Sequence, residues 1–215
     1  MMKKTNYCKP ACLYLSMYIP MTPGRAMMVN SYCTHIGNEL FAWFSSTESK
    51  SRINFLNCLG QGIPVTLSIV SDDAGQFNVF DHALCRIDAE RIINRLIPLN
   101  AEHVKAVDDT REQLWQIYRD LKTCKHEPTA IQAEDIKSRF KTMCSAKTAY
   151  VTLNLALNRM GNNQHELLRV LDKLYLPLHN SLSERDIRDT IKKRKISGST
   201  RSAANLGLLT PEKEF

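Results

Sequence analysis

The chain has 215 residues, of which 43% are hydrophobic and 24% are charged. This balance is typical of a folded globular protein and excludes a disordered or fibrous chain. No window holds the roughly 18 uninterrupted apolar residues that a membrane-spanning helix needs. We therefore expect a cytoplasmic protein with no membrane partner.

The seven cysteines are spread unevenly along the chain, which is typical of free thiols in a reducing compartment. Cys8 and Cys12, followed by Cys33 and His35, are the one arrangement that resembles a zinc site, but the spacing is unusual for zinc. Cys144 lies near basic residues, yet no base accompanies it in the sequence. We expect no metal site and no reactive cysteine.

The positive charge is concentrated in one part of the chain. The net charge is +7, but residues 1–136 sum to −1 and residues 137–201 sum to +9. A basic block on a nearly neutral body is typical of proteins that bind polyanions, because each neutralised phosphate releases counterions. A merely soluble charged surface is the alternative. The charge distribution therefore favours double-stranded DNA as a partner.

The first 135 residues divide into two segments. Residues 1–35 hold three prolines and six methionines without a sustained period, so we expect a poorly ordered, peripheral segment. Residues 36–135 are expected to be a mostly helical accessory region. Within it, alternation at 63–69 predicts a strand closed by a turn at 71–75, although a helix at 62–71 is also compatible.

Two helices are expected next. Apolar residues from Asp81 to Leu96 recur at helical spacing, and Pro98 ends that element. Within residues 104–121, apolar side chains recur at heptad-like spacing and form a seam along one face, which predicts a second helix. The two helices are expected to be joined near Leu99 and Asn100. An interaction scaffold that uses this seam is a further alternative function. Residues 129–135 are expected to form a polar connector.

Residues 136–143 carry the main functional hypothesis. Read as a strand, they place Lys137, Arg139 and Lys141 on one face and Phe140 on the other, because side chains alternate with period two. Such a strand needs a partner, and its own copy in a homodimer is the simplest one. The paired ribbon would enter the major groove with these three cations reading bases.

Two amphipathic helices are expected after this strand. Ser145 would cap the first, which Gly161 would end, and Asn162 and Asn163 would cap the second. The residues expected to contact the DNA backbone here are Ser145, Lys147, Asn162, Asn163 and Gln164. This succession over 136–180 resembles the ribbon-helix-helix DNA-binding module. The expected fold class is α+β, predominantly helical, with that core.

A wider resemblance covers roughly residues 50–200. The run Arg86-Ile-Asp-Ala-Glu-Arg91, then Arg139-Phe-Lys141, then the helices at 150–157 and 167–178 resemble the AcaB family of regulators from conjugative plasmids and integrative elements. The resemblance implies a nucleoid-associated bacterial activator of conjugative transfer genes. RNA polymerase or a second regulator would be further partners.

The last segment, 181–215, is expected to be a basic helix followed by a flexible tail. Ser183 can cap this helix, and the cations that end it could add phosphate contacts. They are Lys192, Lys193, Arg194 and Lys195. The alternative is a solvated helix end that the helix dipole favours.

Enzyme signatures are missing from the sequence: it has no Walker loop, Rossmann fingerprint, nucleophile elbow or zinc-protease motif. Asp72, Asp73, Asp81 and His82 could form a divalent-metal or acid–base cluster, so a metal-dependent nuclease or other nucleic-acid-processing protein of a mobile element is the competing hypothesis. Capping of a turn explains these aspartates more simply. We therefore expect no enzyme, no catalytic residues and no cofactor.

Overall fold

The computed structural model describes residues 12–18, 32–38, 42–47, 51–59, 68–73 and 77–197. The chain folds into two compact units: residues 1–82 with 180–215, and residues 83–179. The first unit is thus built from two stretches of chain, and the second is inserted between them. Sheet and helices are both present and helices predominate, which confirms the expected α+β class.

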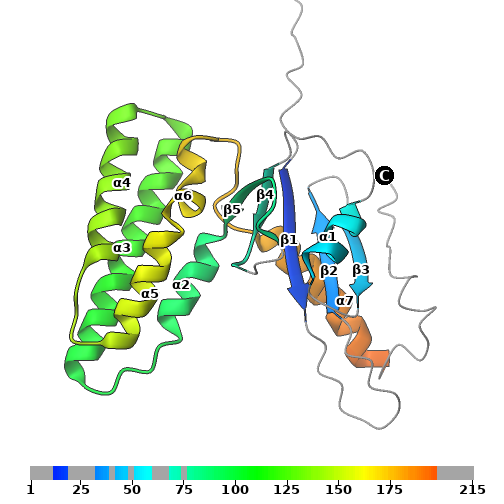
Figure 1. Ribbon diagram of the computed structural model, residues 1–215, viewed down its shortest axis with the longest axis horizontal. Coiled ribbons are helices and arrows are strands. Elements are labelled where there is room, and N and C mark those ends of the chain that lie inside the picture. The colour runs from blue at the N-terminus through cyan, green and yellow to red at the C-terminus, as the bar shows by residue number, and fades with distance from the viewer. Residues whose placement is uncertain are drawn as a thin grey trace, which may run out of the picture. The chain divides into compact units, whose positions relative to one another are not determined.

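The first unit is organised around a five-stranded sheet with the order β3-β2-β1-β4-β5 (Figure 1). β1 is antiparallel to β2 and parallel to β4, and β2 is antiparallel to β3. Helix α7 packs against β1 and β2. The elements are β1 (Cys12–Tyr18), β2 (Tyr32–Gly37), β3 (Ala42–Thr47), α1 (Arg52–Leu59), β4 (Ser68–Ser71), β5 (Asp81–Leu84) and α7 (Ser181–Ser197).

β1 lies in the middle of the sheet, although residues 1–35 were expected to be peripheral. The strand is a seven-residue stretch with leucine, methionine and tyrosine, and prolines at positions 10 and 20 flank it. A strand is expected to lie between such prolines, because proline cannot donate to a ladder of hydrogen bonds. Residues 1–11 and 19–31 lie outside the described part of the chain.

The sequence pattern predicted β4 in part but did not predict β5. The expected strand at 63–69 overlaps β4, whose four residues are all buried, while residues 61–67 lie outside the described part. Residues 81–84 were expected to open a helix, and this was wrong: they form β5. Leu84 and Ile87 are three residues apart, which is a helical spacing. The sequence pattern therefore does not show that one element is a strand that ends at Leu84 and the next a helix.

The second unit consists of helices (Figure 1). Their bounds are α2 (Arg86–Asn94), α3 (Ala101–His126), α4 (Ala130–Ser145), α5 (Val151–Asn162), α6 (Gln164–Leu167) and the short 3₁₀ helix η2 (Arg169–Leu171). The two helices expected before residue 122 are confirmed as α2 and α3. Asn100 caps α3, since its side chain accepts from the His103 backbone N–H at 2.8 Å. Leu121, Leu153 and Leu157 are in the core, each at most 1% exposed.

The expected strand at 136–143 is wrong, because these residues lie within α4. Thr129 caps this helix, so the expected polar connector at 129–135 is mostly its first turns. Ile136, Phe140 and Met143 are buried at helical spacing and hold α4 against its neighbours. Without a strand there is no ribbon, and the ribbon-helix-helix core is not present in this chain's described residues.

The helix after α4 also differs from expectation. Ser145 ends α4, and Tyr150 is the residue that precedes α5. Gly161 does not end α5 but lies within it, because a Cβ there would come within 3.3 Å of the Cys144 Cβ. The glycine therefore permits close approach of α4 and α5. The expected second helix reduces to the single turn of α6, followed by η2.

Among the described helices, none combines the length and apolar character that crossing a membrane requires.

Candidate functional site

The sheet has a change of direction between β1 and β4. From β1 the chain continues to β2 and β3 on one side, and it later returns to β4 and β5 on the other. In open sheets with parallel neighbours, ligands bind beyond the carboxyl ends of the strands at such a switch point. β1 and β4 are parallel, so their carboxyl ends lie at the same edge of the sheet. This edge is the candidate site.

Asp72 and Asp73 follow directly after β4 at this edge, and both are half-buried. The backbone here is fixed by Ser71, whose hydroxyl donates to the Asp72 carbonyl oxygen at 2.6 Å. The same hydroxyl lies 2.7 Å from Nε2 of the buried His82. Ser71 thus ties the exit of β4 to β5 and holds the two aspartates at the end of a rigid strand.

Asp81 and His82 do not join Asp72 and Asp73 in one cluster of side chains. Ser68 donates to Asp81 at 2.5 Å, and His82 contacts Ser71, so both side chains link β5 to β4. Phe80, just before β5, has a φ of 56°, a left-handed conformation that is uncommon for a bulky residue. Of the four residues in the competing metal hypothesis, two are therefore structural.

The first turns of α7 are held against the sheet by a buried histidine. His35 of β2 is 0% exposed; its Nδ1 shares a hydrogen bond of 2.5 Å with Ser183, and its Nε2 lies 3.5 Å from Asp186. His35 therefore positions α7, whereas the sequence had grouped it with cysteines. Cys8 lies outside the described residues, as do the side chains of Cys12 and Cys33.

Glu184 lies in the first turn of α7, next to this anchor. β1 pairs Ser16 with His35, and it pairs Tyr14 with Val70 of β4. β1 therefore lies between the strand that carries His35 and the strand that precedes the aspartates. Glu184 follows Ser183, which is bonded to His35. Nothing in the local sequence distinguishes Glu184 from the other acidic residues of the chain.

The chemistry of this edge suits a hard cation. Within the described ranges, no group of three or more histidine, cysteine, aspartate or glutamate residues lies close enough together to hold a metal ion. Mg²⁺ does not need one, because it is usually bound by one or two carboxylates together with water and substrate phosphates. Asp72 and Asp73 supply two carboxylates of this kind at the end of β4. This pair fits a divalent ion whose other ligands are water and a phosphate.

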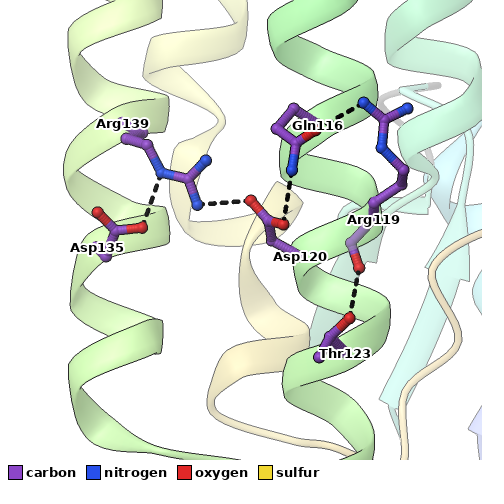
Figure 2. Close-up of polar contacts among 6 residues, drawn as sticks. All are labelled: Gln116, Arg119, Asp120, Thr123, Asp135 and Arg139. Atoms are coloured by element: carbon purple, nitrogen blue, oxygen red, sulfur yellow. Dashed lines mark hydrogen bonds and ion pairs between the residues drawn. The ribbon is translucent and has the colours of Figure 1, made fainter.

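The expected base-reading residues lie on α4 of the helical unit. Arg139 donates from Nη2 to Asp120 at 2.7 Å and from Nε to Asp135 at 2.8 Å, which ties α4 to α3 (Figure 2). Gln116 donates to the same Asp120 at 2.9 Å. The hydrogen bond to Asp120 raises the pKa of Arg139, with the charges of both aspartates adding to it. Its donor edge is thus engaged within the protein.

The other expected DNA contacts are spread over both units of the chain. Lys137 lies 4.0 Å from Asp172, and Lys141 is exposed. Ser145 and Lys147 lie near the start of α5, while Asn162, Asn163 and Gln164 lie at its other end, about 18 Å away at 1.5 Å per residue. Lys192 is exposed on α7 of the sheet unit. The side chains of Lys193, Arg194 and Lys195 lie outside the described residues.

Cys144 is an inert thiol. It is 5% exposed, and burial raises its pKa to about 12. Burial, and not the nearby basic residues, sets the pKa of this thiol.

Comparison with known proteins decides the family. Residues 27–206 match the model of the transposase IS66 family. The chain belongs to the IS66 transposase family. It is also 43% identical over 134 residues to the uncharacterized protein y4jO of Sinorhizobium fredii, an alignment that covers 62% of this chain and 42% of that protein. The chain thus spans less than half the length of this relative. No solved structure matches.

Family membership corrects the function expected from the sequence. The resemblance to AcaB regulators was wrong, and with it the prediction of a transcriptional activator of conjugative transfer genes, because the match over 27–206 is to transposases. The IS66 transposase match instead supports the alternative, a nucleic-acid-processing protein of a mobile element. The homodimer and the partners RNA polymerase and a second regulator stay predictions, and the strand that motivated the homodimer is absent.

Proposed function

We propose that this chain is a DNA-processing part of a transposase, and that the sheet edge beyond β1 and β4 is its reaction centre. The observation that carries the proposal is the position of Asp72 and Asp73 directly after β4, at the switch point of the sheet against which α7, the helix that bears Glu184, also packs. Family membership supports the same chemistry, because transposition requires phosphodiester bonds to be broken and formed.

The reaction is phosphoryl transfer. A hydroxyl oxygen, from water or from a DNA end, attacks the phosphorus and loses its proton, while the bond to one deoxyribose oxygen breaks and that oxygen takes up a proton. A divalent ion, when bound, neutralises charge on the phosphate and makes the attacking oxygen more nucleophilic. Asp72, Asp73 and Glu184 would hold that ion, and rigid strand and helix backbones would keep the three carboxylates in place.

The test is DNA cleavage with the purified chain. The substrate is a supercoiled plasmid that carries the genomic segments on both sides of the gene. We expect nicking or linear product in Mg²⁺ or Mn²⁺, and none in EDTA. Binding without cleavage in either ion would contradict the proposal, and cleavage that survives EDTA would contradict the role of the carboxylates. The comparisons do not support the expectation that the chain is not an enzyme. This cleavage assay tests that expectation.

We further propose that the exposed face of α7 contacts the DNA backbone. Arg185, Arg188 and Lys192 are exposed and recur at i, i+3 and i+7, so they share one helix face. Ser183 and Ile187 are buried on the opposite face against the sheet. This basic face is therefore on the same helix as Glu184, where a phosphate backbone passing the reaction centre could reach it.

Replacing the three cations of this face with alanine should weaken binding to all DNA sequences alike. The slope of log K against log salt should flatten by about 0.9 for each phosphate that the protein no longer neutralises. The control is alanine at three exposed cations of the helical unit, Arg95, Lys105 and Lys122. Binding measured by fluorescence anisotropy at several salt concentrations should separate the two variants. Equal slopes for both would place the DNA elsewhere.

A further inference from the structure

Exposed apolar side chains gather at one end of the helical unit. Within residues 83–179, which the structure describes in full, six large hydrophobic residues are exposed, and five of them belong to three neighbouring segments. Figure 1 shows these segments, the loop after α2, the start of α3 and the start of α5, at the same end of the unit. Single exposed apolar residues are normal, whereas a group of them indicates an interaction surface. We call the five residues the apolar end: Ile97, Leu99, Val104, Val151 and Leu155.

Three contacts tie the segments of the apolar end together. The Tyr150 hydroxyl donates to the Ile97 carbonyl oxygen at 2.9 Å, and the Tyr150 ring stacks on the His103 ring with 4.4 Å between centroids. The Leu99 backbone N–H donates to Nδ1 of His103 at 3.4 Å. The start of α5, the loop and the first turn of α3 are therefore joined. A surface that is held in this way loses little conformational freedom when it binds a partner.

The loop at the centre of the apolar end is not polar, as loops normally are. Residues 96–99 read Leu-Ile-Pro-Leu, with Ile97 77% and Leu99 80% exposed. The core does not use these two side chains, since Ile93, Val107 and Leu153 are the buried residues of the same three segments of chain. An exposed run of apolar residues is unfavourable in water unless a partner covers it.

The charges around the apolar end select the kind of partner. Residues 95–109 and 147–155 carry three exposed cations and three exposed acids, and none of the six is in an ion pair within residues 83–179. Balanced charge gives a polyanion such as DNA no net attraction. It suits a second copy of the same surface, because a two-fold axis lets the cations of one copy face the acids of the other. The six residues are Arg95, Lys105, Lys147, Glu102, Asp108 and Asp109.

We propose that the apolar end is an interface between two copies of this chain, related by a two-fold axis. In such an interface each apolar residue is buried in both copies, so a small patch counts twice. The interface does not depend on the proposed reaction, because it belongs to the helical unit and needs no DNA. It also does not depend on the strand that the sequence had suggested for a homodimer, since that segment lies in α4.

Sedimentation velocity of the full chain without DNA tests the proposal. We expect a mass of about twice the 24.5 kDa of one chain at micromolar concentration. Leu99→Asp and Val151→Asp each place a carboxylate in the interface, from two different segments. Ile131→Asp is the matched control, because Ile131 is 85% exposed at the start of α4 and lies outside the apolar end. All three variants should keep the circular dichroism spectrum of the parent, since exposed positions tolerate substitution.

We expect Leu99→Asp and Val151→Asp to weaken dimerisation by about 30-fold or more, because a symmetric interface would bury two unpaired carboxylates. Ile131→Asp should dimerise like the parent. A monomeric parent would overturn the proposal and leave another protein as the occupant of the apolar end. A dimer that survives both Leu99→Asp and Val151→Asp, or that Ile131→Asp disrupts equally, would overturn it as well, because the interface would then lie elsewhere.

Discussion

Removing the carboxylates at the sheet edge should abolish DNA cleavage without unfolding the protein. The double substitution Asp72→Asn/Asp73→Asn and the single substitution Glu184→Gln each keep the size of the side chain but remove its negative charge. We expect each to lower the rate of cleavage by about 100-fold or more, since a carboxylate that holds a catalytic metal acts in the transition state itself. Single-turnover cleavage in Mg²⁺ measures the effect.

DNA binding and thermal stability separate this effect from a structural one. Both variants should melt within about 2 °C of the parent, since half-buried surface positions tolerate isosteric changes. Their affinity for DNA should not fall, because fewer negative charges face the phosphates. Asp108→Asn and Glu112→Gln, two exposed acidic residues of α3, are the matched controls and should cleave normally. Full activity in the sheet-edge variants would move the reaction centre elsewhere.

Phe140→Ala should strongly destabilise the helical unit. Phe140 is 3% exposed and packs inward from α4 beside the buried Ile136 and Met143. Truncating a buried phenylalanine removes its transfer free energy and leaves a cavity, which together cost about 3–5 kcal/mol of unfolding free energy. Denaturant unfolding measures the cost, and Lys141→Ala at the exposed neighbouring position is the control. Equal midpoints for the two variants would show that α4 does not bury this face.

Phe140 also shows how the sequence can predict burial while missing the element. Ile136 and Phe140 point inward whether the segment is a strand or a helix, because a separation of four fits both periods. Met143 decides between them, since only the helical period also places it inward, and it is buried. Lys137, Arg139 and Lys141 alternate in the sequence by chance, and they do not share one face because the segment is a helix. A short amphipathic run could not settle this by itself.

Only part of the candidate site could be predicted from the sequence, for a different reason. Asp72 and Asp73 stand out in the sequence as an acidic turn after an apolar run, and they were the basis of the competing metal hypothesis. Glu184 is more than 100 residues further along the chain, with the whole helical unit between them. What brings them into one unit is the pairing of β1 with both β2 and β4, together with the packing of α7 on β1 and β2. Such long-range pairing leaves no trace in local periodicity.

Iron-mediated cleavage of the polypeptide tests most directly whether the carboxylates share one metal. Fe²⁺ replaces Mg²⁺ at the site, and with ascorbate and peroxide it generates radicals that cut the backbone close to the bound ion. The account predicts cuts at two places, near residues 72–73 and near residues 183–185, both suppressed by excess Mg²⁺ and both absent in Asp72→Asn/Asp73→Asn. Cuts near one of these places alone, or at unrelated positions, would contradict a reaction centre formed by the end of β4 and the first turn of α7.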